Sequence, residues 1–600
     1  MYRTCTCGAL NAKNIGEEVT LIGWVNKLRN LWWLVFIDLR DRYGITQITI
    51  DPKKEIEIEG WTLETIKSEF VVQATWTVVS RPDDMINQEM ITGEIEIQPT
   101  KIKIVSSCVE LPFTITDEVA TSEDNRLKYR YLDIRRTPLK KNLLLRNEIL
   151  HYLRNKMYDL GFIEVQTPIL TASSPEWARD FVVPSRVYPW RFYALPQAPQ
   201  IYKELLMVGG MDKYFQIAPC FRDEDPRADR TLEFYQLDFE MSFVTEDDIL
   251  NIGEEIFYDT FSKFSDKKVS PRPFRRIAYN DAIDQYGSDK PDLRFEMTIQ
   301  DITSIFQKTT FTIFQNVLSD GGIINAIVAK NAADKYSRKD LDALTEFAKS
   351  KKASGLAYLK IGDEITGSIA KVVSDEEISS LKQQLHLEHN DLVLIISGPR
   401  KIVKSSLGQV RLNVANTLWL IDPTRLELCI INDFPMFEYD EKNQKRDFCH
   451  NPFSLPHGWV DAYKNIDPQN DDLEKILAHQ FDFVCNGNEM ASGAIRNHDL
   501  DSMAKGFEIV WYSREEVEKR FRSIFTAFKY WCPPHGGMAP GIDRLIMLIQ
   551  DEPNLREVQA FPPSASGQDL MMGSPAYLMP QQLEELKIIV PEEEKEEKSE

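Results

Sequence analysis

The chain has 600 residues, of which 43% are hydrophobic and 27% are charged, a composition typical of a globular protein with several domains. It contains no run of eighteen apolar residues and no signal-peptide pattern at its start, so we expect no membrane span and a cytoplasmic location. The formal net charge of −22 excludes a uniformly basic nucleic-acid binder, but it leaves room for local basic faces.

The first hundred residues predict a small β-barrel. Five segments between residues 18 and 105 alternate polar and apolar residues or run apolar, and many of these residues are β-branched. One short helix is expected near 62–69. This set is typical of an oligonucleotide-binding barrel, although strand count alone also fits other barrels. Stretches 22–42 and 126–155 are locally basic, so RNA could dock along them.

A polar hinge over 106–140 comes next, and a helix is expected over about 142–160, where apolar residues recur at helical spacing until Gly161. From 161 to about 285, strands alternate with loops. Residues 290–415 change character and carry few candidate catalytic groups.

The 290–415 segment predicts a helix over 335–351 and strands at 311–314 and 391–398, which together indicate an inserted α+β domain. Strand-like segments return at 427–433 and 505–511. The folded part is expected to end near residue 560, and the last ten residues hold six Glu, which predicts a solvated, mobile tail.

Segment 222–240 carries the first candidate site. It is crowded with charge but lies between two apolar, strand-like runs, which predicts two antiparallel strands joined by a charged loop. A solvated hairpin is the alternative. Arg222 lies at the apolar end of the first strand, where an unpaired guanidinium is costly, so it predicts an anion such as a phosphate.

Two later segments add to this site. In 531–548 a Gly-rich turn leads into an apolar helix with Arg544 near its start, and such a turn lets an anionic ligand approach the backbone. In 481–498, Asp482 and Glu489 are seven residues apart across a Gly turn and can face one another from adjacent strands. Two carboxylates beside phosphates predict Mg²⁺, with unrelated surface acids as the alternative.

These three segments resemble the class II aminoacyl-tRNA synthetases. Motif 1 of that family is similar to residues 161–168, which end in Pro168; motif 2 is similar to residues 221–224 with Phe234 and Asp238; and motif 3 is similar to residues 541–544. Segments 173–186, 192–207, 493–498 and 533–537 narrow the resemblance to the bacterial aspartyl-tRNA synthetases. The barrel segment 29–47 and the hinge segment 129–136 also match, and the resemblance covers about residues 1–575.

The resemblance implies a multidomain α+β fold. Its expected parts are an anticodon-binding barrel of the oligonucleotide-binding type at 1–108, a hinge at 109–140, a class II antiparallel-sheet catalytic domain at 141–288 and 417–562, an inserted α+β domain of the bacterial type at 289–416, and a C-terminal extension with the acidic tail at 563–600.

The resemblance also implies which residues bind the substrates, L-aspartate and ATP. Aspartate is expected at Glu176, Gln200, Ile201, Tyr202, Lys203, Arg222, Asp238, His450 and Arg496. ATP is expected at Arg222, Asp223, Glu224, Phe234, Glu489, Gly541, Ile542, Asp543 and Arg544, with Mg²⁺ on Asp482 and Glu489 and with Arg222, Arg544 and Glu489 as catalytic residues.

Physical chemistry agrees with these assignments. Distinguishing aspartate from asparagine requires cations around the side chain, and Lys203 and Arg496 are the matching positions. A buried guanidinium that faces a neutral amide loses its partner, at a cost of roughly 2–5 kcal/mol. The resemblance further implies that Phe234 stacks on adenine, that Arg222 binds the α-phosphate and that Arg544 reaches the γ-phosphate.

The implied reaction is aspartyl-adenylate formation followed by transfer of aspartate to the 3′ end of tRNA-Asp. Arg29, Phe36 and Gln47 match anticodon-reading positions of the barrel, and motif 1 implies a homodimer. Whether tRNA-Asn is also charged stays open, although Leu31 favours strict use of tRNA-Asp. Rival hypotheses are a synthetase for asparagine or lysine, a non-catalytic RNA-binding or amidotransferase-scaffold relative, and amide synthesis without tRNA.

The sequence departs from the family most clearly at tryptophan. We interpret eight tryptophans that stand where the family has glycine as UGA codons that mean glycine in the host and are rendered here as tryptophan; Trp24 does not belong to this set. The eight are Trp32, Trp33, Trp76, Trp177, Trp190, Trp419, Trp511 and Trp531. A ring at Trp531, next to the Gly-rich turn, is expected to impair adenylation. Thr231 and Asn451 replace a frequent Gln and a common second His.

Overall fold

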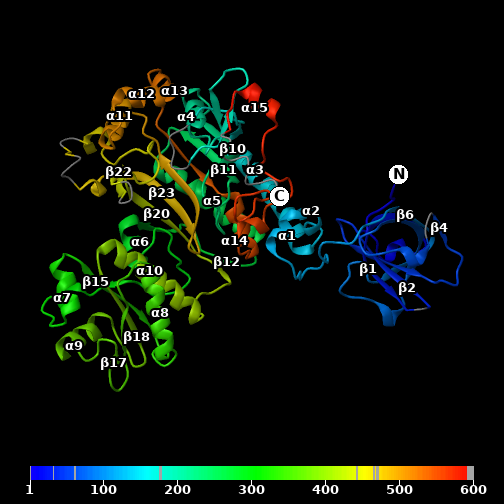
Figure 1. Ribbon diagram of the computed structural model, residues 1–600, viewed down its shortest axis with the longest axis horizontal. Coiled ribbons are helices and arrows are strands. Elements are labelled where there is room, and N and C mark those ends of the chain that lie inside the picture. The colour runs from blue at the N-terminus through cyan, green and yellow to red at the C-terminus, as the bar shows by residue number, and fades with distance from the viewer. Residues whose placement is uncertain are drawn as a thin grey trace. The chain divides into compact units, whose positions relative to one another are not determined.

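The computed structural model describes residues 2–31, 33–59, 62–173, 179–440, 444–463, 466–467 and 472–590 (Figure 1). The chain forms two compact units, Met1–Thr121 and Ser122–Glu600. In the part of the chain that is described, no helix is both long and apolar enough to cross a membrane.

The first unit is the predicted barrel. Its strands are β1 (Glu18–Asn30), β2 (Val35–Arg40), β3 (Ile45–Ile50), β4 (Glu57–Glu59), β5 (Val71–Ser80) and β6 (Ile95–Ser106). They follow the order β3-β2-β1-β5-β6-β4, and a further pairing of β3 with β6 closes the sheet. Alternate residues of β1 and β5 are buried, because successive side chains of a strand point to opposite faces.

Two details of the barrel differ from the expectation. A sixth strand, the three-residue β4, lies parallel to β6 and was too short to show an alternation. The helix expected near 62–69 is a single 3₁₀ turn, Leu63–Thr65, because the chain reaches Val71 and re-enters the sheet.

The second unit begins with α1 (Glu123–Lys128), α2 (Arg130–Asp133) and α3 (Thr137–Asp159). Helix α3 therefore begins about five residues before the predicted start, and Pro138 lies in its first turn, where its missing N–H costs nothing.

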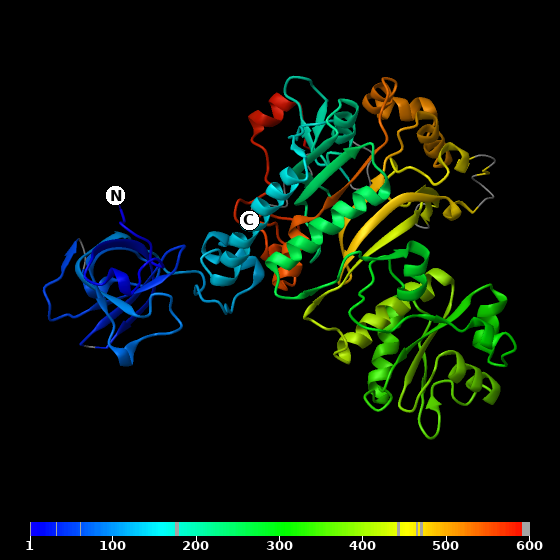
Figure 2. The ribbon, with the colours of Figure 1, turned by 180° about the vertical axis from the view of Figure 1, so that it is seen from behind.

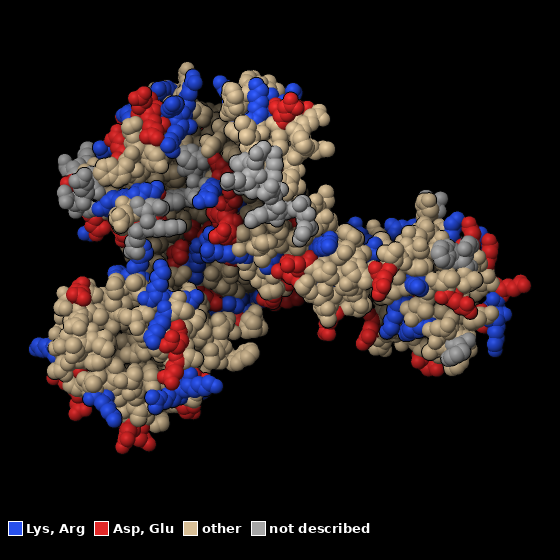
Figure 3. Space-filling model, in the orientation of Figure 1, with Lys and Arg blue, Asp and Glu red and all other residues tan. Residues whose placement is uncertain are grey.

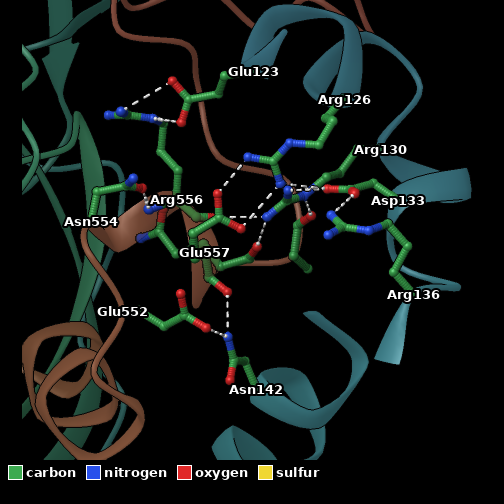
Figure 4. Close-up of polar contacts among 12 residues, drawn as sticks. Glu123, Arg126, Arg130, Asp133, Arg136, Asn142, Glu552, Asn554, Arg556 and Glu557 are labelled. Carbon is green, nitrogen blue, oxygen red and sulfur yellow. Dashed lines mark hydrogen bonds and ion pairs between the residues drawn. The ribbon is translucent and has the colours of Figure 1, made fainter. Parts of the chain in front are cut away.

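A polar network joins α1 and α2 to the segment that follows helix α14 (Ile542–Gln550) (Figure 4). Arg130 and Asp133 are buried and 2.7 Å apart, and Arg130 also donates to the carbonyls of residues 559 and 560. Arg126 donates to both carboxylate oxygens of Glu557, at 2.6 and 3.2 Å. These arginines helped to make stretch 126–155 basic, but they are engaged in internal contacts and not available to RNA.

An eight-stranded sheet forms the centre of the second unit, in the order β13-β20-β23-β24-β25-β11-β10-β7. Its strands are β7 (Ile163–Glu164), β10 (Lys213–Phe221), β11 (Glu233–Ser242), β13 (Arg275–Ala278), β20 (Leu428–Pro435), β23 (Leu477–Cys485), β24 (Asn488–Ile495) and β25 (His535–Pro540). Helices α3, α5 (Glu246–Phe264) and α14 (Ile542–Gln550) bury their apolar faces against it (Figure 2). These three helices leave the other face of the sheet open, and the cavity described below lies on that face.

A smaller cluster of helices packs beside this sheet. It consists of α4 (Gln200–Val208), α11 (Leu500–Ile509), α12 (Arg514–Arg520) and α13 (Arg522–Phe528), with the hairpin β21 (Phe437–Asp440) and β22 (Lys445–Phe448). The strand predicted at 505–511 is wrong, because this segment belongs mostly to α11. Met503, Ala504 and Phe507 are buried at helical spacing, which a short apolar run does not distinguish from a strand.

The segment predicted as an inserted α+β domain has its own five-stranded sheet. Its elements are β14 (Gln300–Asp301), α7 (Thr312–Ser319), β15 (Ile323–Ala329), α8 (Arg338–Ser350), β16 (Ala357–Lys360), β17 (Thr366–Gly367), α9 (Asp375–Gln384), β18 (Leu392–Gly398) and α10 (Arg400–Thr417), preceded by α6 (Tyr279–Tyr286). The predicted strand at 311–314 is wrong: Phe311, Phe314 and Leu318 share one face of α7 and pack into the core.

Structure continues past residue 560, where the folded part was expected to end. A 3₁₀ turn, Leu555–Glu557, and helix α15 (Pro580–Leu586) follow α14, while the acidic tail 591–600 lies outside the described residues. The remaining short strands are β8 (Val182–Pro184), β9 (Phe192–Ala194), β12 (Lys268–Val269) and β19 (Arg425–Leu426).

Several tryptophans adopt a backbone conformation that favours glycine. Trp190, Trp419, Trp459, Trp511 and Trp531 have φ between +56° and +73°. A bulky residue rarely occupies this region, because its Cβ collides with the backbone. Trp32 and Trp177, which belong to the eight positions singled out above, lie outside the described residues.

Two of these tryptophans end helices in the same way as true glycines. After α10, Trp419 donates to the carbonyl of Asn416 and the next residue donates back to Ala415. Trp511 does the same after α11. Gly161 and Gly321 show the identical pattern of hydrogen bonds after α3 and α7, which is the usual glycine cap of a helix.

Candidate active site

One cavity of about 450 Å³ gathers most of the predicted site residues on the open face of the large sheet. The space-filling view shows Lys and Arg side chains beside Asp and Glu side chains in a hollow of this unit (Figure 3). The predicted residues that line the cavity are Gln200, Lys203, Arg222, Glu224, Phe234, Asp238, His450, Glu489, Arg496, Gly541, Asp543 and Arg544.

The other predicted residues lie elsewhere. Tyr202 donates to or accepts from Thr171 at 3.0 Å, Ile201 packs against the helical cluster, and Ile542 is buried in the main core. Asp223 does not line the cavity. Glu176 lies outside the described residues.

A buried layer of paired charges forms the floor of the cavity. Lys203 on α4 lies 2.6 Å from Asp238 and 3.2 Å from Glu240, and Arg496 contacts Glu240 through two hydrogen bonds of 2.9 and 3.1 Å. Asp238 and Glu240 are two residues apart on β11, so they point to the same face of the sheet. Both predicted aspartate-binding cations are thus fixed by carboxylates of the protein.

Burial alone would raise the pKa of Glu240, but Arg496 and Lys203 outweigh it and lower the pKa to about 2. Glycine is required beside this carboxylate: a Cβ on Gly537 would lie 2.4 Å from the Glu240 Oε2 atom and 2.0 Å from a backbone oxygen. The glycines of the 533–537 turn therefore make room for the charge layer.

Asp238 offers a free hydrogen-bond acceptor to the cavity. Its Oδ1 atom accepts from Lys203, while its buried Oδ2 atom makes no hydrogen bond within 3.5 Å among the described residues, although Asp238 lies close enough to the Tyr214 hydroxyl to help burial raise the pKa of that tyrosine. Burial raises the pKa of Asp238 even though Lys203 opposes this shift. An ammonium group of a ligand would satisfy this oxygen, because leaving a buried acceptor unpaired is costly.

The two predicted phosphate-binding arginines enter the same cavity from different elements. Arg222 directly follows β10, and its guanidinium carbon lies 5.0 Å from the centre of the Phe234 ring. The buried Nε atom of Arg222 has no partner in the described part of the chain. Arg544, in the first turn of α14, donates to the carbonyl of Glu489 at 2.7 Å.

Asp543 and Glu224 serve the structure of these loops. Asp543 accepts from Arg146 and from the backbone N–H of Tyr235, so it joins α14 to α3 and β11. Glu224 pairs with Arg230 at 3.2 Å across the loop between β10 and β11.

Three carboxyl groups and a histidine lie together beside the cavity; of these, His450 and Glu489 line it, whereas Asp289 and Asp482 do not. Possible ligand atoms of Asp289, His450 and Asp482 all lie within 4.8 Å of one another. Asp482 is on β23 and Glu489 is on the neighbouring strand β24. Glu489 lies opposite Val484, two residues after Asp482. Burial, aided by Glu489, raises the pKa of Asp482 well above its ordinary value, and its Oδ2 atom has no partner among the described residues.

This donor set suits a hard divalent cation such as Mg²⁺, which prefers carboxylate oxygens. Burial alone would raise the pKa of Glu489, but Lys290 and Arg544 lower it to about 2. Burial lowers the pKa of His450, so this imidazole is neutral at neutral pH.

Sequence reasoning missed several residues of the site. Glu240 could have been found by the strand alternation that follows from Asp238. His535 and Glu204 are buried 3.4 Å apart next to the charge layer; burial lowers the pKa of His535, but Cys532 and Glu204 outweigh it and raise the pKa to about 10. No local pattern marked Asp289 or Lys290, which come from a distant part of the sequence.

Thr231 and Asn451, the two other positions at which the sequence departs from the family, both line the cavity. The buried hydroxyl of Thr231 has no partner among the described residues, and Asn451 donates to Gln200 at 3.4 Å. Trp531 does not line the cavity, and its side chain is 91% exposed. We expected its ring to impair adenylation by filling space at the site. This steric reason is wrong, because the ring lies outside the cavity.

The barrel unit brings its three predicted residues together. Arg29 lies 3.2 Å from the side-chain oxygen of Gln47 and 5.5 Å from the centre of the Phe36 ring. Strand pairing explains this: β2 lies between β1 and β3, with Arg29 opposite Phe36 and Gln47 opposite Asp38.

Comparison with known families agrees with this geometry. Residues 122–565 match the family model described as tRNA synthetases class II (D, K and N), and residues 19–105 match that of the OB-fold nucleic acid binding domain.

Curated relatives are similar over almost the whole chain. A protein of Rickettsia canadensis named aspartate–tRNA(Asp/Asn) ligase is 48% identical over 592 residues, 98% of each chain. One of the same name from Phenylobacterium zucineum is 47% identical over 593 residues, again 98% of each.

Solved structures show the same fold at lower identity. The asparaginyl-tRNA synthetase of Pyrococcus horikoshii, solved with asparaginyl-adenylate, has a TM-score of 0.56 at 17% identity and covers 97% of this chain and 100% of its own. A crystal structure of a putative aspartyl-tRNA synthetase from Leishmania major has a TM-score of 0.56 at 17% identity, covering 93% and 94%.

Proposed function

Since the chain belongs to the class II tRNA synthetases of the D, K and N group, we propose that it is an aspartate–tRNA ligase. It activates L-aspartate with ATP to aspartyl-adenylate and pyrophosphate, and it then transfers aspartate to the 3′ end of tRNA-Asp. The observation that carries this function is the single cavity that holds Arg222 and Arg544 together with Lys203 and Arg496.

The charge layer supports recognition of aspartate. Lys203 and Arg496 present cationic faces to the cavity while Asp238 and Glu240 hold them in place, so a side-chain carboxylate meets prepositioned donors. The free Oδ2 atom of Asp238 would accept from the substrate ammonium. A neutral amide would offer these cations no negative charge beyond that of Asp238 and Glu240, which disfavours asparagine.

Arg222 and Arg544 support the binding of ATP. Arg222 beside Phe234 is placed to contact the α-phosphate when adenine stacks on that ring, and Arg544 is placed for the far phosphates. The α-carboxylate of aspartate attacks the α-phosphorus, and the bond to the leaving pyrophosphate breaks. A ribose hydroxyl of tRNA then attacks the acyl carbon and AMP leaves. Positioning and charge stabilisation carry both steps.

Asp482 and Glu489 would hold Mg²⁺ on the phosphates, because Glu489 lines the cavity and Asp482, on the neighbouring strand, supplies a buried carboxyl group beside it. When bound, the cation neutralises the charge that develops on the leaving pyrophosphate.

The barrel supports tRNA binding. Phe36 would stack on an anticodon base and Arg29 and Gln47 would contact base edges, as such barrels bind splayed single strands.

We also propose that the enzyme is a homodimer. Apolar side chains are exposed on and after the motif 1 segment, and the bridge from Thr171 to Ala194 joins this segment to the β8–β9 hairpin. A monomer rarely exposes so many large apolar groups together. They include Ile163, Ile169, Leu170, Val182, Val187, Tyr188 and Phe192.

A second substrate, tRNA-Asn, is favoured by the names of the relatives, which are ligases for tRNA(Asp/Asn). Leu31 argued for strict use of tRNA-Asp. Aminoacylation with both purified tRNAs tests this: aspartate esterified to both supports the broader function, and aspartate on tRNA-Asp alone supports the stricter one.

A further inference from the structure

One lysine of the cavity wall has no part in the function described so far. Lys290 lies in the segment between α6 and β14, where the chain enters the 290–415 region. Its ammonium is 2.8 Å from Glu489 Oε2 and 3.8 Å from Asp289 Oδ2. Glu489, which is predicted to bind Mg²⁺, therefore already contacts the ammonium group of a lysine.

The local charge explains why this lysine is held there. Asp289, Asp482 and Glu489 bring three carboxyl groups together beside the part of the cavity wall that Lys290, His450 and Glu489 form. Lys290 is the ammonium that directly contacts this group, while Arg544 donates to the backbone carbonyl of Glu489. A carboxylate that is partly removed from water is stabilised by a cation in direct contact with it.

Helix α10 of the 290–415 region packs against the segment that contains Lys290 and forms hydrogen bonds with it. Arg411 of α10 is 1% exposed and donates to the carbonyls of Asp292, Phe295 and Met297. Gly287 packs directly on α10: a Cβ there would lie 2.2 Å from a backbone oxygen of that helix. The lysine is thus fixed at the cavity by a helix that contains none of the predicted site residues.

We propose that Lys290 is a positioning residue that acts as a placeholder cation. Its ammonium group pairs with the Glu489 carboxylate and compensates negative charge of the three neighbouring carboxyl groups until the nucleotide-bound divalent cation takes its place. The 290–415 region holds the lysine in this position. The placeholder keeps the empty site ordered and prevents it from collecting free divalent cations. This inference rests on the proposed function of the cavity.

The test measures binding of Mn²⁺ to the nucleotide-free protein by the loss of the free-ion signal in electron paramagnetic resonance. The Lys290→Met variant removes the cation that contacts Glu489 and Asp289, so Mn²⁺ should bind at least about tenfold more tightly than to the unaltered protein. Lys290→Arg keeps the charge and should restore the weak binding.

Lys330→Met is the matched control, because it removes a lysine that lies 2.8 Å from Asp391 in the same region and away from the cavity. It should leave Mn²⁺ affinity unchanged. In the double variant Lys290→Met with Glu489→Gln the gain should disappear, because the vacated carboxylate is gone. Thermal melting checks that each variant folds, and Lys290→Gln replaces the Met variant if the latter does not fold.

An equal or weaker Mn²⁺ affinity in folded Lys290→Met or Lys290→Gln would overturn the inference. This failure is distinct from failure of the proposed function. Aspartate-dependent exchange of pyrophosphate into ATP by the unaltered protein tests that function without reference to Lys290.

Discussion

Asp238 is the residue of this site whose contacts best distinguish a substrate-binding role from a purely structural one. One of its oxygens holds Lys203, and the other is buried without a partner among the described residues. A purely structural ion pair would satisfy both oxygens, because an unpaired buried acceptor costs about 1–3 kcal/mol. The free oxygen therefore points to a ligand with a donor group.

Replacing Asp238 by Asn tests this role. The amide keeps the size of the side chain but weakens a charged hydrogen bond worth about 1.5–3 kcal/mol, so the KM for aspartate should rise by about 10- to 100-fold. The KM for ATP should change little. Pyrophosphate exchange measured at varied aspartate and varied ATP separates the two values, and equal KM increases for both substrates would count against the assignment.

The tryptophans at positive φ give a second prediction. Trp419→Gly and Trp511→Gly should each raise the free energy of unfolding by about 1 kcal/mol, because the left-handed region costs an L-residue roughly that much. Trp33→Gly is the control, since Trp33 is also exposed but has an ordinary φ. Urea unfolding measures all three, and a loss of stability in both helix-end variants would contradict the interpretation.

The interpretation also predicts the mass of the protein made in its own host. It should carry glycine at these positions and be lighter than the printed chain; tryptophan in the native protein would end the hypothesis. Trp76 is the weakest member of the set, because it is fully buried in the barrel at ordinary φ, although its buried indole N–H has no partner among the described residues.

Much of the site could be predicted residue by residue, and the exceptions have a common cause. Arg222, Arg544 and Glu489 lie in segments whose glycines, charges and apolar flanks indicate a ligand. Lys290 and His535 become functional candidates only through contacts with residues about 200 and 330 positions away. Local spacing contains no information about such contacts.

At the scale of elements, the network between α1, α2 and the Leu555–Glu557 turn sets the position of the segment that follows α14. Leu555 donates to the carbonyl of Ala228, in the loop between β10 and β11, and lines the cavity. Arg556 contacts Glu123 on one side and the carbonyl of Arg227 on the other. Packing at the start of this unit is thereby connected to the loop between β10 and β11, which we propose contacts ATP.

The Arg126–Glu557 pair makes this network sensitive to acid. Burial alone would raise the pKa of Glu557, but Arg126 holds the pKa below its ordinary value. A depressed carboxyl pKa stabilises the fold above the ordinary value, and this stability is lost as pH falls through the folded-state pKa. Arg126→Met should cost about 3 kcal/mol near neutral pH, and the difference should shrink in acid.

Urea unfolding of the unaltered protein and of Arg126→Met between neutral and acidic pH measures this difference. Arg514→Met is the control, because Arg514 pairs with Asp501 and Glu518 at the surface, where such pairs contribute about 0–1 kcal/mol. A difference for Arg126 that does not change with pH would refute the assignment to Glu557.

The barrel gives the other prediction at this scale. Phe36→Ala should weaken tRNA binding by about 1–3 kcal/mol, the contribution of one stacked base, while pyrophosphate exchange stays the same. Filter binding of tRNA and the exchange assay separate the two effects. Loss of both activities together would instead indicate misfolding.

The elements that could be predicted are those with a long periodic pattern, such as β1, β5 and α3. The errors at 311–314 and 505–511 arose where a few apolar residues fit a strand or a helix equally well, and only the packing of Phe314 and Phe507 decides. The three-residue β4 forms because β6 offers it an edge, which its own sequence does not show.

At the scale of the whole molecule, the exposed apolar surface after motif 1 predicts a dimer. Leu170→Asp places a charge in that surface, so the variant should have the mass of a monomer in light scattering at a concentration where the unaltered protein has twice that mass. The exposed Val109→Asp, in the other compact unit, is the control and should leave the dimer intact. A monomeric unaltered protein would contradict the proposal.

The central claim is that one cavity binds ATP and aspartate for transfer to tRNA. The most direct test is pyrophosphate exchange with aspartate, asparagine and lysine in parallel, followed by charging of purified tRNA-Asp. We predict exchange with aspartate alone and aspartate esterified to tRNA-Asp. Exchange with asparagine or lysine in place of aspartate, or no exchange with any of the three, would contradict the account.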